Sequence, residues 1–150
     1  MSDLMDLYQE TILDHNRQPR NFGSLPACDH EAAGHNPLCG DKLNVYLTIS
    51  GDTIVDIRFD GSGCAISKAS ASLMTEAVKG KSLAEVESLY GGFHELLTGD
   101  PSVRGEASVE LGKLAVFEGV REFPVRVKCA TLAWHTLQAA LSGDKKVSTE

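Results

Sequence analysis

At 150 residues, with 42% hydrophobic residues, the chain is long enough to form one domain with a packed core. Its formal net charge of −7 argues against broad binding to nucleic acids or anionic membranes, because such binding needs a basic face. The sequence has no run of about 20 apolar residues, so we expect no membrane span. The acidic residues Asp3, Asp6 and Glu10 do not fit a secretory signal, and we therefore expect a cytoplasmic protein.

The first half of the chain predicts a helix followed by a β-hairpin. Residues 2–14 carry apolar side chains at helical spacing, and this helix should stop near Asn16. Residues 17–42 are rich in Pro, Gly and Asn, and we expect them to form a loop. Apolar and polar residues alternate over 43–49 and again over 55–59, which predicts an antiparallel hairpin with one buried face.

The second half is expected to be mostly helical, which makes the whole chain an α+β domain. Helical spacing predicts several segments: 64–79, 82–90, 93–97, 111–116 and 130–141. The glycines at 91–92 should break this pattern, residues 123–128 should be extended, and Trp134 should lie in the core. We treat residues 1–150 as a single domain in which residues 1–3 and 144–150 fray.

The cysteines are spaced without any CxxC pair, so the spacing alone is a weak metal signal. Cys39 and Asp41 flank Gly40, and a glycine at this point permits a tight turn that aims both side chains at one place. Cys64 and Cys129 each stand at the start of an expected helix, where the thiol pKa is lowered. The alternative for any single cysteine is a buried apolar thiol.

Three thiolates and one carboxylate around Zn²⁺ would leave an excess of two negative charges. Lys42, Arg126 and Lys128 are close in sequence to the candidate ligands and could offset this charge, or could simply be solvated. Cys28 has no motif partner and is interpreted as a spare thiol. His35 is left out of the ligand set because a loop histidine is more often solvated or hydrogen-bonded.

Three motifs, at residues 36–41 (NPLCGD), 61–67 (GSGCAIS) and 126–130 (RVKCA), resemble the U-type iron–sulfur cluster assembly family, which includes the IscU and NifU N-terminal groups. The resemblance extends over roughly residues 4–142. It implies a SufE/NifU-like α+β fold, with a small three-stranded antiparallel sheet packed against helices. It also implies that the metal or cluster ligands are Cys39, Asp41, Cys64 and Cys129.

Two departures favour the SufU subgroup, whose members bind zinc and relay sulfur from a SufS-type cysteine desulfurase. Scaffold members of the IscU type usually carry a histidine where this chain has Lys128, and this chain has extra residues around 91–106. The resemblance therefore predicts a zinc-dependent sulfurtransferase in which Cys39 accepts persulfide sulfur. Its partners would be a pyridoxal-phosphate-dependent cysteine desulfurase and a downstream iron–sulfur scaffold.

Two alternatives stay open at this stage. The first is a scaffold that assembles a [2Fe–2S] cluster on Cys39, Cys64 and Cys129. The second is a structural zinc domain that only mediates protein contacts. Asp41 counts against the second alternative, because closed structural zinc sites usually consist of four cysteines or of cysteines and histidines.

Overall fold

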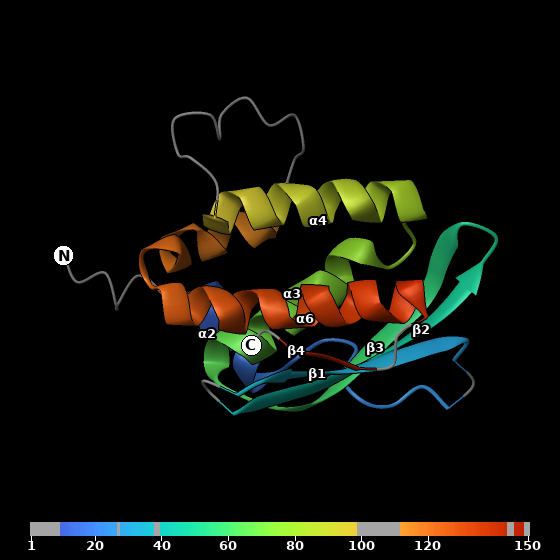
Figure 1. Cartoon of the computed structure of the whole chain (residues 1–150), viewed down its shortest axis with the longest axis horizontal. Helices are drawn as coiled ribbons and strands as arrows, with labels where there is room; N and C mark the ends of the chain where they lie inside the picture. The colour runs from blue at the N-terminus through green and yellow to red at the C-terminus, as the bar shows by residue number, and fades with distance from the viewer. Residues whose placement is uncertain (1–9, 27, 38–39, 99–111, 144–145, 149–150) are drawn as a thin grey trace.

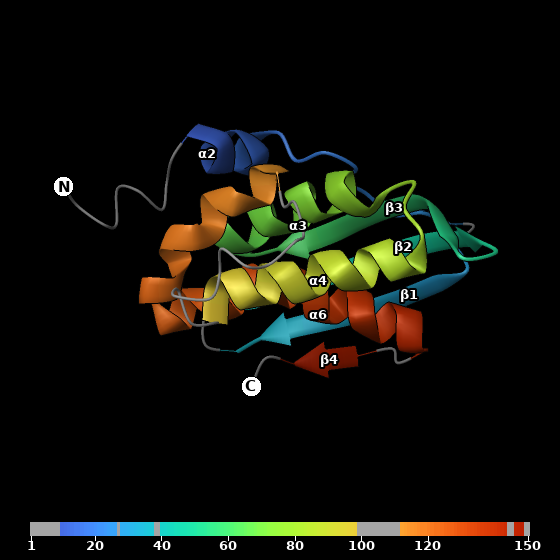
Figure 2. The same ribbon diagram turned by 90° about the horizontal axis from the view of Figure 1, so that it is seen from above.

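The computed structural model describes residues 10–26, 28–37, 40–98, 112–143 and 146–148. The elements in chain order are α2 (Glu10–Arg17), β1 (His30–Asn36), β2 (Asp41–Ser50), β3 (Thr53–Ser62), α3 (Ala65–Val78), α4 (Leu83–Thr98), the 3₁₀ helix η1 (Gly112–Glu122), α6 (Pro124–Ser142) and β4 (Lys146–Ser148). The sheet forms one layer, α3 and α6 pack on one of its faces, and α4 lies beyond them (Figure 1). Seen from above, α2 lies beside α3, at the side of the molecule away from β4 (Figure 2).

The strand order in the sheet is β3-β2-β1-β4. Strands β1, β2 and β3 are antiparallel, so the predicted three-stranded antiparallel sheet packed against helices is confirmed. The predicted hairpin is also confirmed, because β2 and β3 join through the two-residue turn Gly51-Asp52. Gly51 has a φ of +63°, which a residue with a side chain rarely adopts. Alternate residues of β2 are buried from Asp41 onward, which places this carboxylate on the face that packs against the helices.

Strand β1 lies within residues 17–42, so the prediction of a loop is wrong for residues 30–36. Its inward-facing positions are Ala32, Gly34 and Asn36, which are small or polar and give no hydrophobic alternation. The small residues are needed because α6 approaches closely, and a Cβ atom on Gly34 would overlap the Thr136 hydroxyl. The tail also differs from expectation: residues 146–148 pair in parallel with β1 instead of fraying.

The helices run further than the glycine and proline positions suggested. Helix α4 continues through Gly91 and Gly92, so the break that we expected there is wrong. Residues 91–98 of the predicted insert belong to this helix, and the rest of the insert lies outside the described residues. The first helix ends at Arg17, one residue beyond the predicted stop, and residues 2–9 of that prediction are likewise not described.

Helix α6 starts at Pro124, so the prediction that residues 123–128 are extended is wrong. Proline is well suited to the first turn of a helix, where its missing N–H has no intrahelical partner. The end of the helix is as expected, with Gly143 in the left-handed conformation at φ +88°. The helix therefore carries Cys129 in its second turn.

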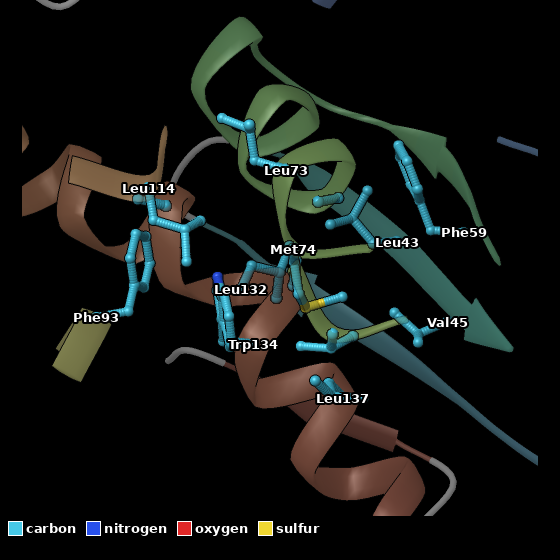
Figure 3. Close-up of a cluster of buried hydrophobic side chains, with 14 of the residues drawn as sticks. Leu43, Val45, Phe59, Leu73, Met74, Phe93, Leu114, Leu132, Trp134 and Leu137 are labelled. Carbon is cyan, nitrogen blue, oxygen red and sulfur yellow. The ribbon is translucent and has the colours of Figure 1, made fainter. Parts of the chain in front are cut away.

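Buried aromatic and aliphatic side chains from α3, α4, η1, α6 and the sheet form the core (Figure 3). Trp134 is fully buried, as predicted, and it stacks on Phe93 with ring centroids 5.1 Å apart. Phe117 meets Phe93 edge-on at 5.8 Å. These contacts fix α6 between the sheet and α4, and so fix the helix that carries Cys129. None of the described helices is both long enough and apolar enough to cross a membrane.

Candidate metal centre

The turn between β1 and β2 positions Asp41. Asn36, the last residue of β1, pairs with Asp41, the first residue of β2. The Gly40 N–H donates to the Asn36 carbonyl oxygen at 2.9 Å, and Gly40 has a φ of +74°. This conformation favours glycine and starts β2 with the Asp41 side chain pointing inward, where it is fully buried.

Cys64 lies between β3 and α3 and caps the N-terminus of the helix. Its sulfur accepts a hydrogen bond from the Ser67 N–H at 3.4 Å. Gly61 and Gly63, on the approach to Cys64, pass close to β2. A Cβ on Gly61 would overlap the Lys42 carbonyl oxygen, and one on Gly63 would come within 2.7 Å of Asp41 Oδ1. The two glycines therefore allow Cys64 to lie beside Asp41.

Cys129 is fully buried in the second turn of α6. The prediction that it begins a helix is wrong, because the helix already starts at Pro124. Its thiol donates to the Val125 carbonyl oxygen at 3.7 Å. The side chain thus points from α6 towards the sheet end where β1 meets β2, since it also lies 3.5 Å from the Asn36 amide nitrogen.

These three segments bring a carboxylate and two thiols together. The candidate ligand atoms of Asp41, Cys64 and Cys129 all lie within 4.8 Å of one another. In a tetrahedral zinc site, bonds of about 2.0–2.3 Å place the ligand atoms roughly 3.3–3.8 Å apart, so an adjustment of about 1 Å around one ion would suffice. The donor set therefore fits a zinc ion. Cys39, the fourth predicted ligand, lies outside the described residues, between Pro37 and Gly40 in the sequence.

The Asp41 carboxylate is held at both oxygens. The Cys64 N–H donates to Oδ1 at 2.9 Å, and the Asn36 side-chain amide donates to Oδ2 at 3.1 Å. The same Asn36 nitrogen lies 3.5 Å from the Cys129 sulfur. Sequence reasoning assigned no role to Asn36, although it opens the NPLCGD motif; a polar residue beside candidate ligands was the available signal.

The electrostatic setting favours ionisation of one thiol. Hydrogen bonding with Cys129 is the largest cause that lowers the Cys64 thiol pKa, to about 6, and the Ser67 N–H acts in the same direction. Burial and the charge of Asp41 oppose this shift. A thiolate is the form of cysteine that binds metals, so Cys64 is ready to act as a ligand near neutral pH.

The remaining candidates do not join this cluster within the described part of the chain. Cys28 is a half-buried free thiol, and burial together with the charge of Glu31 raises its pKa. His35 and Lys42 are exposed, and Lys128 is half-buried. The interpretation of Cys28 as a spare thiol and the omission of His35 from the ligand set stay predictions.

Comparison with known families gives an independent test of the resemblance. The family described as NifU-like N terminal domain matches residues 7–130. The chain belongs to this family. The recognition of a U-type iron–sulfur cluster assembly protein from the three cysteine motifs is thereby confirmed.

The named relatives of the chain divide between two descriptions. A zinc-dependent sulfurtransferase SufU from Bacillus subtilis is 37% identical over 145 residues, which span 96% of this chain and 95% of that protein. An iron–sulfur cluster assembly scaffold protein IscU from Streptococcus pyogenes is 40% identical over 141 residues, which span 94% and 86%. The crystal structure of FiSufU from Fervidobacterium islandicum, described as a scaffold for the SUF system, aligns with a TM-score of 0.79 at 34% identity. That alignment covers 90% of this chain and 96% of the other.

Proposed function

We propose that this chain is a zinc-dependent sulfur acceptor in iron–sulfur cluster assembly, and that it takes persulfide sulfur from a cysteine desulfurase of the SufS type. The observation that carries the proposal is the convergence of Asp41, Cys64 and Cys129 within 4.8 Å. The relative named as a zinc-dependent sulfurtransferase, similar over 96% of this chain, supports zinc as the metal. Reduced thiols are needed for this activity, which agrees with a cytoplasmic location.

In this proposal, Asp41, Cys64 and Cys129 hold the metal and Cys39 is the fourth ligand and the acceptor. A carboxylate among the ligands suits a site that exchanges one donor, because closed structural zinc sites are built from cysteine and histidine. Bound Zn²⁺ would keep the coordinating thiols deprotonated. Cys64 supports this role because its pKa already lies near 6.

The transfer step needs no added oxidant or reductant. The Cys39 thiolate attacks the terminal sulfur of the persulfide on the desulfurase cysteine. A new sulfur–sulfur bond forms on Cys39, the bond within the donor persulfide breaks, and the electron pair leaves on the donor cysteine as a thiolate. The persulfide on Cys39 then passes its terminal sulfur to a downstream iron–sulfur scaffold by the same exchange.

A second candidate function is that of a scaffold for a [2Fe–2S] cluster. The relative named as an assembly scaffold, 40% identical to this chain, favours it. The same cysteines would then bind iron, with Asp41 as the remaining ligand.

Metal and sulfide content separate the two candidates. We would purify the chain without oxygen and measure zinc, iron and acid-labile sulfide before and after adding a SufS-type desulfurase with cysteine. About one zinc without sulfide, and faster desulfurase turnover, is the expected result. Iron and sulfide in near-equal amounts, with zinc displaced, would favour the scaffold instead.

A matched pair of cysteine variants tests the acceptor. Cys39→Ser should abolish formation of a persulfide on this chain, as measured by mass spectrometry after alkylation. Cys28→Ser should leave it unchanged, because Cys28 lies outside the cluster and its thiol pKa is raised. Persulfide formation that survives Cys39→Ser would contradict the proposed acceptor.

A further inference from the structure

The side chain of Asn36 lies between two of the proposed ligands. It is fully buried at the end of β1, and its amide nitrogen is 3.1 Å from Asp41 Oδ2 and 3.5 Å from Cys129 Sγ. We propose that Asn36 is a positioning residue of the metal centre, whose two amide hydrogens orient Asp41 and Cys129 relative to Cys64. This inference rests on the proposed role of these residues as metal ligands.

The hydrogen bonds of Asp41 show how the Asn36 amide helps to orient its carboxylate. Oδ1 is tied to the start of α3 through the Cys64 N–H, at 2.9 Å, and Oδ2 is tied to β1 through Asn36. Two donors from different elements fix the carboxylate plane, whereas one bond would allow it to rotate. Each oxygen keeps a further lone pair that can bind a metal.

Asparagine is suited to this position because its amide carries two hydrogens. A carboxylate oxygen only accepts hydrogen bonds, so the nitrogen of Asn36 must face Asp41. Its second hydrogen then points to the Cys129 sulfur. The neutral amide of Asn36 thus connects β1 to the Asp41 oxygen on β2 and to the Cys129 sulfur on α6. Its two hydrogen bonds disperse the negative charge of these groups without an added cation.

The oxygen of the Asn36 amide argues against a role in packing alone. Asn36 Oδ1 is buried and has no hydrogen-bond partner among the described residues. A buried acceptor without a partner is unfavourable. An apolar residue would fill the same space without this cost, so the position keeps an amide for its donor side.

The test measures zinc affinity without any sulfur-transfer assay. Zinc would be titrated in competition with a chromophoric chelator into the unsubstituted chain, Asn36→Ala and Asn36→Asp. Residues that orient metal ligands typically change affinity by about 10- to 100-fold, and we expect a loss of this size in both variants. Asn36→Asp keeps the shape of the side chain and creates no cavity, but it replaces both donor hydrogens with a carboxylate that repels Asp41.

The control is a matched asparagine elsewhere in the sheet. Asn44 on β2 donates to Asp60 Oδ1 at 2.9 Å, which is the same type of bond away from the metal centre. Asn44→Ala should leave zinc affinity unchanged. Unchanged affinity in a folded Asn36→Ala or Asn36→Asp variant would overturn the proposal, as would an equal loss in Asn44→Ala.

A spectroscopic test needs no variant. In the chain loaded with ¹¹³Cd, a side-chain amide proton of Asn36 should show scalar coupling to cadmium through its hydrogen bond to the Cys129 sulfur. Lack of this coupling in loaded protein would overturn the proposal. If the unsubstituted chain bound zinc but accepted no sulfur, only the proposed function would fail; if it bound no zinc, both would fail.

Discussion

The Cys64 thiol owes its ionisation to its neighbours and not to exposure. Its hydrogen bond with Cys129 is the largest cause that lowers its pKa, and the Ser67 N–H at the start of α3 adds to this effect. Burial and the nearby Asp41 carboxylate act in the opposite direction without cancelling it. The lowered pKa of Cys64 therefore depends on the folded site, where the two sulfurs lie close together.

The pH dependence of alkylation tests this difference. In metal-free protein, the rate of Cys64 alkylation by iodoacetamide should rise through a midpoint near pH 6, because the thiolate is the nucleophile. Cys28 should react slowly at pH 7, because burial raises its pKa above the ordinary value of 9.0. Mass spectrometry of the two peptides measures both rates in one sample. A Cys64 midpoint near pH 9 would contradict the expectation.

Removal of the Asp41 side chain separates the two candidate functions. Asp41→Ala deletes the proposed oxygen ligand and the acceptor of both the Cys64 and Asn36 hydrogen bonds. For a zinc-dependent sulfur acceptor we expect zinc affinity to fall about 10-fold or more, with a matching loss of sulfur transfer. Zinc titration and persulfide formation measure the two effects. Intact zinc binding with unchanged transfer would exclude Asp41 from the centre, and longer retention of a bound cluster would favour a scaffold.

At the scale of elements, the sequence predicted those parts that carry a strong periodic pattern. The hairpin of β2 and β3 and the span of α3 follow directly from alternation and helical spacing. Strand β1 was not found because its buried positions hold Ala32, Gly34 and Asn36, which are small or polar and so give no hydrophobic alternation. The resemblance implied a third strand, but the residue pattern did not locate it.

At the candidate site, too, the sequence predicted some features and missed others. The glycine turn before Asp41 and the helix start at Cys64 were predicted, since both signals are visible in the sequence. The place of Cys129 within α6 was not predicted, because residues 123–128 were expected to be extended, whereas Pro124 is the first helical residue. Asn36 could not be assigned, since its contact with Cys129 joins residues 93 positions apart.

The connection between β3 and α3 should be sensitive to a single added methyl group. In Gly63→Ala, the new Cβ would lie 2.7 Å from Asp41 Oδ1, and the carboxylate cannot yield without losing its hydrogen bonds. We expect weaker zinc binding, measured by chelator competition, while the circular dichroism spectrum is retained. Zinc affinity equal to that of the unsubstituted chain would show that the approach of this connection to Asp41 is unimportant.

Gly91→Ala is the control for that substitution. Gly91 lies inside α4 with no atom within 4 Å of an added Cβ. Alanine is favoured over glycine in a helix interior by about 1 kcal/mol, so this variant should be more stable by about that amount. Urea unfolding measures the change in stability, and zinc affinity should stay the same.

At the scale of the whole molecule, a buried histidine joins α2 to α3. His15 is 2% exposed, and its Nδ1 lies 2.6 Å from the Ser72 hydroxyl. Its Nε2 lies 3.7 Å from the Glu76 carboxylate. Burial is the main cause that lowers the His15 pKa below its ordinary value of 6.5, and the charge of Arg20 adds to it. The folded protein therefore holds His15 as the neutral imidazole.

This histidine should make the fold sensitive to acid. The unfolded chain binds a proton at His15 near pH 6.5, before the folded chain does, so the free energy of unfolding should fall as the pH drops from about 6.5 through the folded pKa. His135, whose pKa is also lowered by burial, acts in the same direction. Cys64 contributes in a higher window, between 9.0 and about 6.

Urea unfolding of zinc-free protein at pH 8, 7, 6 and 5 would measure the effect. His15→Gln cannot be protonated, and its stability should decline less between pH 6.5 and pH 5 than that of the unsubstituted chain. An equally steep decline in both proteins would show that His15 does not contribute to acid sensitivity.

The order in which the proposed ligand residues are synthesised affects when a metal ion could bind. Asp41 and Cys64 lie in the strand and helix start that leave the ribosome early, whereas Cys129 belongs to α6, the last of the described helices. A domain generally folds as a unit, and α6 packs against both the sheet and α3, so the three donors come together only once α6 is in place. A growing chain thus offers an ion an incomplete set of donors, from which it can readily be lost. Under the proposed function, stable metal loading would follow the docking of α6 onto the sheet.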